Sequence, residues 1–120
     1  RENFHISNIK NSERSIFAMS IPYGYYLAPN GYVIIDQEKA NIVRMIYQQY
    51  LSGMSLGGIA DFLFEQGIPS PKGRERWTQP VLSNLLSNQK YIDYIVSFDD
   101  FFLVQGEKSR RSNIWRVSRG

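Results

Sequence analysis

The chain has 120 residues, no cysteine and a single histidine, and it carries a formal net charge of +3. This length suits one compact domain, while the missing cysteines and the lone His5 exclude disulfide frameworks, thiolate zinc sites and histidine metal centres, so neither a metal nor a cofactor is expected. No apolar run approaches the roughly 18 residues of a spanning helix and no signal-like segment opens the chain, which predicts a soluble, cytoplasmic protein.

Two runs rich in tyrosine, isoleucine and valine flank a turn sequence near the N-terminus. They are separated by APNG at 28–31, in which proline presets φ for a turn and Asn-Gly accepts a positive φ. The pattern predicts a β-hairpin over 21–35. Residues 1–20 show little periodicity and are interpreted as an arm or short helix that ends an interdomain linker, because a start at Arg1 indicates a piece of a longer protein. Residues 21–120 form the predicted domain.

Two helices are predicted to follow the hairpin. Asp36 offers its carboxylate as an N-cap, and apolar residues then recur every three or four positions, which predicts a helix from Asp36 to Leu51. Ser55 caps a second helix that ends at Gly67. Two glycines in the first turn of this helix cost roughly 1 kcal/mol each relative to alanine, and close approach of a neighbouring helix is a reason to keep them.

The stretch GIPSPKGRERWTQP, 67–80, joins the second helix to a third. Thr78 caps the third helix, and Pro80 is tolerated in its first turn because the missing N–H is no loss there. A valine and three leucines form one apolar stripe, so the opposite face is polar and uncharged. That face consists of Gln79, Ser83, Asn84, Ser87 and Asn88.

From Tyr91 onward the composition turns aromatic and β-branched. This change predicts a second hairpin, Tyr91 to Gln105, with its turn at two aspartates. Residues 106–113 are polar and basic without periodicity and are expected to form a flexible loop, and 114–117 are expected to return as one more strand. The predicted fold class is α+β, a three-helix core with a helix-turn-helix-like pair and small antiparallel β-hairpins.

Positive charge gathers in the second part of the chain. Residues 1–71 hold five basic and six acidic side chains and residues 72–120 hold nine basic and five acidic ones, which gives −1 and +4. A rigid turn between helices explains the glycine, prolines and Trp77 of the joining stretch, but a core has no use for its cations. Lys72, Arg74 and Arg76 are therefore interpreted as phosphate ligands. A second group either extends that strip or is only solvated: Lys90, Lys108, Arg110 and Arg111.

The polar face of the third helix has two interpretations. It is either solvated surface or the face of a recognition helix, on which Asn and Gln can hydrogen-bond adenine. The candidate DNA contacts at this helix are Thr78, Gln79, Ser83, Asn84 and Ser87. No nucleophile elbow, phosphate loop or HExxH motif appears, and capping accounts for the available carboxylates, so this piece is expected not to be an enzyme.

The order of these pieces resembles a known family. The residues that carry the resemblance are PYGY at 22–25, Asp36 and Glu38 leading into IVRMIYQQYLSGMS, IADFLFEQGIPSPKG, and Trp77-Thr78 opening VLSNLLSNQKYI. They are similar to the "recombinase" domain of the large serine recombinases, which are site-specific recombinases of the resolvase/invertase type and include phage and transposon integrases. The resemblance covers about 22–93.

The resemblance implies that this piece binds duplex DNA at an attachment site, for integration or excision of a mobile element, and does not cut it. Cleavage would belong to a serine of a preceding catalytic domain, which would also hold the full-length protein as a dimer or tetramer, whereas the piece alone is expected to be a monomer. The sequence departs from the family's common pattern at Phe64 and Asp93 and lacks arginines in the third helix, which leaves the set of DNA contacts open.

Two other functions fit the same sequence. A winged-helix transcription regulator would use the helix pair with the second hairpin as its wing. A protein-interaction module would instead use the aromatic surface of that hairpin, Tyr91 to Phe102, and its binding would be indifferent to salt.

Overall fold

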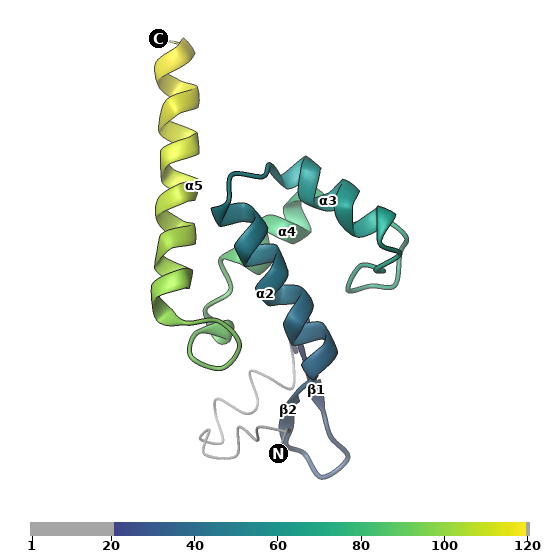
Figure 1. Cartoon of the computed structure of the whole chain (residues 1–120). Coiled ribbons are helices and arrows are strands. Elements are labelled where there is room, and N and C mark those ends of the chain that lie inside the picture. Colours follow the sequence, from purple (N-terminus) through teal and green to yellow (C-terminus); the bar gives the residue numbers. More distant parts are fainter. Residues whose placement is uncertain (1–20, 120) are drawn as a thin grey trace. The chain divides into compact units, whose positions relative to one another are not determined.

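The computed structural model describes the backbone of residues 21–119 and the side chains of residues 21–112, so the predicted arm at 1–20 lies outside the described residues. The chain is α+β, as predicted, and within the described part no helix is long and apolar enough to cross a membrane. Figure 1 shows the elements in chain order: β1 (Tyr25–Leu27), β2 (Val33–Ile35), α2 (Gln37–Leu51), α3 (Leu56–Glu65), α4 (Gln79–Leu86), the 3-10 helix η1 (Gln89–Tyr91) and α5 (Phe98–Arg119).

The predicted first hairpin is confirmed. Strands β1 and β2 pair antiparallel, with Tyr26 opposite Ile34. The turn between them is closed by the Gly31 N–H, which donates to the carbonyl of Ala28 at 2.9 Å. Gly31 has φ +90°, a conformation that glycine adopts at no steric cost.

Helix α2 confirms the predicted helix almost to the residue. The Asp36 carboxylate accepts from the Lys39 N–H at 3.3 Å and so satisfies one of the first orphan donors. Val43, Ile46 and Tyr47 are fully buried on one face of this helix. The chain divides between residues 45 and 46, inside α2, into two compact units. The first unit contains the hairpin and the start of α2, and the second contains everything from Ile46 onward.

Helices α3 and α4 begin at the two predicted caps. Ser55 Oγ accepts from the Gly58 N–H at 3.0 Å, and Thr78 Oγ1 accepts from the Val81 N–H at 3.4 Å. The two helices are in contact, and each buries its apolar stripe. A Cβ added at Gly57 would lie 3.4 Å from the side chain of Gln79 in α4, so the glycine does sit beside the neighbouring helix.

The second predicted hairpin is wrong, and so are the basic loop and the last strand. Residues 91–105 form the end of η1, a short turn and the start of α5, and α5 continues through 106–113 and 114–117 to Arg119. The helix starts where Ser97 Oγ accepts from the Asp100 N–H at 3.0 Å, and the acidic first turn suits the helix dipole. Phe101 and Val104, three residues apart, are both buried, so packing overrides the strand-like composition. The described part therefore contains no second hairpin to serve as a wing.

Candidate nucleic-acid interface

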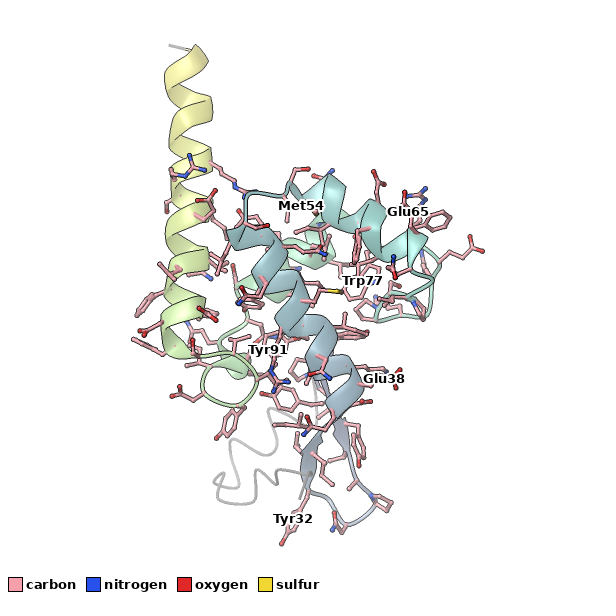
Figure 2. All side chains as sticks on the ribbon, viewed as in Figure 1. Tyr32, Glu38, Met54, Glu65, Trp77 and Tyr91 are labelled. Atoms are coloured by element: carbon pink, nitrogen blue, oxygen red, sulfur yellow. The ribbon has the colours of Figure 1, made fainter. Side chains whose placement is uncertain are left out.

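The connection between α3 and α4, residues 66–78, is held in a defined conformation by its own hydrogen bonds. The Ser70 N–H donates to the Arg74 carbonyl at 2.8 Å, and Ser70 Oγ accepts from the Arg74 N–H at 3.0 Å. Gly73 lies between them with φ +82°. Trp77 is 3% exposed and its indole Nε1–H donates to the Ile68 carbonyl at 3.0 Å, which fixes the two ends of the connection to each other. Figure 2 labels Trp77 in this region.

Two of the three cations of the connection are exposed and uncompensated. Lys72 and Arg74 have no ion pair and no side-chain hydrogen bond within the described residues. Arg76 differs, because its guanidinium lies 3.3 Å from the Asp61 carboxylate and 4.0 Å from the centre of the Phe64 ring. Both members of that ion pair are more than half exposed, so solvent screens the attraction and the pair contributes little stability.

The hollow beside this turn is not suited to an anion. It has a volume of about 300 Å³ and is lined by Phe64, Gly67, Pro69, Gly73 and Glu75. The carboxylate of Glu75 would repel a phosphate, and the apolar side chains would not solvate it. The cations of the turn lie on its exposed side chains.

The predicted polar face of α4 is divided between solvent and α5. Gln79 and Asn84 are exposed, whereas Ser83 and Ser87 are partly buried. Lys108 of α5 donates to the Ser83 carbonyl at 3.1 Å and also bonds the Ser87 hydroxyl. Thr78 serves as the N-cap.

Sequence reasoning missed the side chains that hold the C-terminal end of α4. The Tyr47 hydroxyl, fully buried, lies 3.2 Å and 3.1 Å from the carbonyls of Leu85 and Leu86, and Gln105 Nε2 donates to the Leu86 carbonyl at 2.8 Å. Burial raises the pKa of Tyr47 and lowers the pKa of Lys108. Donors from α2 and α5 thus satisfy carbonyls that a helix end leaves without intrahelical partners. No sequence signal links residues 38 positions apart.

The cations of α5 also have partners inside the chain. Arg111 donates to the carbonyls of Tyr50 at 2.9 Å and Met54 at 3.0 Å and lies 3.9 Å from the centre of the Tyr50 ring. Glu107 accepts from both Arg110 and Arg111 at 2.6 Å. These hydrogen bonds lower the pKa of the Glu107 carboxyl to about 2, and the bond from Arg110 has the larger effect. Arg111 therefore joins α5 to the end of α2 as a C-terminal cap would.

Lys90 lies in η1 with a partly buried side chain, and its N–H donates to Asn88 Oδ1 at 2.9 Å. The twelve predicted contacts thus differ in their surroundings. Those on the connection and the start of α4, together with Asn84, are exposed. By contrast, Ser83, Ser87, Lys108, Arg110 and Arg111 bond other residues of the chain. Among the described residues, no group of three or more acidic or histidine side chains is placed to hold a metal ion.

The site is thus part of a small α+β module in which a cation-bearing turn leads directly into α4. A protein-family model described as Recombinase matches residues 37–117, which is most of the chain. The chain belongs to the Recombinase family, and the resemblance read from its sequence is confirmed. No solved structure matches it.

Proposed function

We propose that this chain is the duplex-DNA-binding module of a site-specific serine recombinase, which recognises attachment-site DNA during integration or excision of a mobile element. The observation that carries the proposal is the pair of uncompensated, exposed cations Lys72 and Arg74 on a turn that its own hydrogen bonds hold in place. Family membership supplies the ligand class, because recombination acts on DNA.

Phosphate binding is assigned to the connection. Lys72 and Arg74 neutralise backbone phosphates and give affinity without sequence preference. Arg76 contributes less, since Asp61 already offsets its charge. Lys90 is assigned as a peripheral phosphate contact, whereas Arg110 is paired with Glu107 and is not assigned one.

Sequence reading is assigned to the exposed side of α4. Gln79 and Asn84 are amides on the solvent side of this helix, and an amide can bond N6 and N7 of adenine together in the major groove. The side chains of Ser87, Lys108 and Arg111 have internal partners, and Ser83 accepts from Lys108 through its backbone carbonyl. Their role in the proposal is to fix α4 and α5 in position.

Strand cleavage is assigned to another domain of a longer protein, which would act in the cytoplasm and assemble as a dimer or tetramer through that domain. The present chain supplies binding and targeting.

The test compares two variants that each lose two positive charges. We expect Lys72→Gln/Arg74→Gln to weaken binding to a random duplex, measured by fluorescence anisotropy, by roughly 50-fold at about 0.1 M salt, since each phosphate contact is worth about eightfold there. The control Lys39→Gln/Arg44→Gln removes two positive charges from the start of α2. It should weaken duplex binding less than about threefold, through its effect on net charge. Equal losses in both variants would refute the assignment.

Base reading needs a separate test on a specific duplex. The preferred site is first obtained by selection from a random duplex library. Asn84→Ala should cost about 1–3 kcal/mol on the selected duplex and leave random duplex binding unchanged. A uniform loss on both duplexes would instead make Asn84 a backbone contact.

A further inference from the structure

One side of α5 is buried and the opposite side exposes large apolar residues. Phe101 and Val104 face the core, while Phe98 is 49%, Phe102 55% and Leu103 59% exposed. The rings of Phe98 and Phe102 contact edge to face, with centres 4.4 Å apart. We call Phe98, Phe102 and Leu103 the α5 apolar patch. A patch of adjoining apolar side chains on a surface marks an interaction site more often than isolated ones do.

A glycine lies inside this helix next to the patch. Gly106 follows Phe102 by four residues and Leu103 by three, so it shares their side of α5. Glycine in a helix interior costs about 1 kcal/mol relative to alanine, yet a Cβ at Gly106 would meet nothing within 4 Å. No contact of the described chain therefore requires this glycine. A second helix that approaches closely would require it.

Opposite charges flank the patch. Asp99 lies in the first turn of α5, and Arg110, with a side chain 57% exposed, lies one turn beyond Gly106. Arg110 binds Glu107 through Nε and one terminal nitrogen, at 2.9 Å and 2.6 Å. Its other terminal nitrogen has no hydrogen bond among the described residues, and a guanidinium has donors to spare.

We propose that α5 is a self-association surface, on which a second copy of this chain packs its own α5 antiparallel. Phe102 of each copy lies over Gly106 of the other. The same register brings Asp99 of each copy beside Arg110 of the other. The reason is that the pair 99/110 and the pair 102/106 are centred on nearly the same point of the helix. The α5 apolar patch and Gly106, over which the partner's Phe102 packs, lie on the same helix. A two-fold dimer needs this self-complementarity.

The first experiment is sedimentation velocity on the full chain without DNA, from about 1 to 500 µM, where contacts of this limited size associate. We expect a reversible monomer–dimer equilibrium. Gly106→Leu should weaken dimerisation at least tenfold, because the leucine would occupy the space over which the partner's Phe102 packs. The variant should remain folded as a monomer, because a Cβ at this position meets nothing within 4 Å. Phe102→Ala should weaken dimerisation similarly.

The matched control is Ser112→Leu, which also adds a leucine to an exposed position of α5. Ser112 lies six residues after Gly106 and so about 120° around the helix. The dimerisation constant of Ser112→Leu should stay within about twofold of that of the unaltered chain. A chain that remains monomeric at the highest concentration, or a Gly106→Leu variant that dimerises normally, would overturn the proposal. Neither result involves DNA, so neither bears on the proposed binding function.

The register has its own test, because the chain has no native cysteine. Asp99→Cys and Arg110→Cys are prepared separately and then mixed under air oxidation. We expect disulfide-linked dimers to form faster in the mixture than in either variant alone. Faster cross-linking of the single variants would mean a parallel arrangement and would reject the antiparallel one.

Discussion

The hydroxyl of Tyr47 offers the sharpest test of how α4 is held. Tyr47→Phe removes a donor that lies 3.2 Å and 3.1 Å from two α4 carbonyls, while the ring and its edge contact with Tyr91 remain. The Leu86 carbonyl keeps Gln105 as a donor and the Leu85 carbonyl keeps the Asn88 N–H. Neither oxygen is fully orphaned, so we expect a loss of about 1–1.5 kcal/mol in the free energy of unfolding and not the roughly 3 kcal/mol of an unsatisfied buried group.

The assay is urea unfolding followed by far-ultraviolet circular dichroism, with thermal unfolding as a second measure. For a domain of this size the expected loss lowers the midpoint by roughly 4–10 °C. The control is Tyr26→Phe, which removes a hydroxyl from an exposed tyrosine and should change the unfolding free energy by less than about 0.5 kcal/mol. If Tyr47→Phe proves as stable as Tyr26→Phe, the hydroxyl does not anchor α4.

Three further results are expected. Asp61→Asn frees Arg76 and removes a negative charge, so DNA affinity measured by anisotropy should rise roughly two- to eightfold at about 0.1 M salt; unchanged affinity would mean that Arg76 does not face DNA. Glu107 stabilises the fold above its ordinary pKa of 4.5, and this contribution is lost as the pH falls toward its lowered pKa of about 2. The gap in melting temperature between the unaltered chain and Glu107→Gln should therefore close over that range, and a constant gap would count against the pairing with Arg110 and Arg111. Gly73→Ala places a side chain at φ +82° and should cost about 1 kcal/mol of unfolding free energy, whereas no cost would mean that the turn relaxes freely.

Local signals sufficed where the sequence itself stabilises the element. Asp36, Ser55 and Thr78 each provide a side-chain acceptor for a helix start, and the APNG turn provides a positive φ, so the hairpin and the first three helices were predictable. The family followed from the order of these same elements.

Helix α5 was missed because its composition is that of a strand. Aromatic and β-branched residues predominate in 91–105, and the packing of Phe101 and Val104 overrides their preference for a strand. One signal was available. Ser97, followed by an acidic residue three positions later, is the sequence signature of a helix start, and its hydroxyl does accept from the Asp100 N–H.

The error at α5 changed the predicted site. Lys108 and Arg111 resemble phosphate ligands when 106–113 is taken as a loop. On a helix they lie against α4 and the end of α2, and their donors meet backbone carbonyls. Contacts of this kind join residues far apart in sequence, so spacing alone gives no indication of them. The cations of the connection were not affected, because a glycine and prolines already fix that segment as a turn.

The most direct test of the central claim is the salt dependence of binding to a duplex. The logarithm of the association constant is measured against the logarithm of salt concentration for the unaltered chain and for Lys72→Gln/Arg74→Gln. If these two side chains neutralise phosphates, the variant's slope should be shallower by about 1.8, which is roughly 0.9 for each lost contact. Parallel lines would contradict the claim that this turn meets DNA.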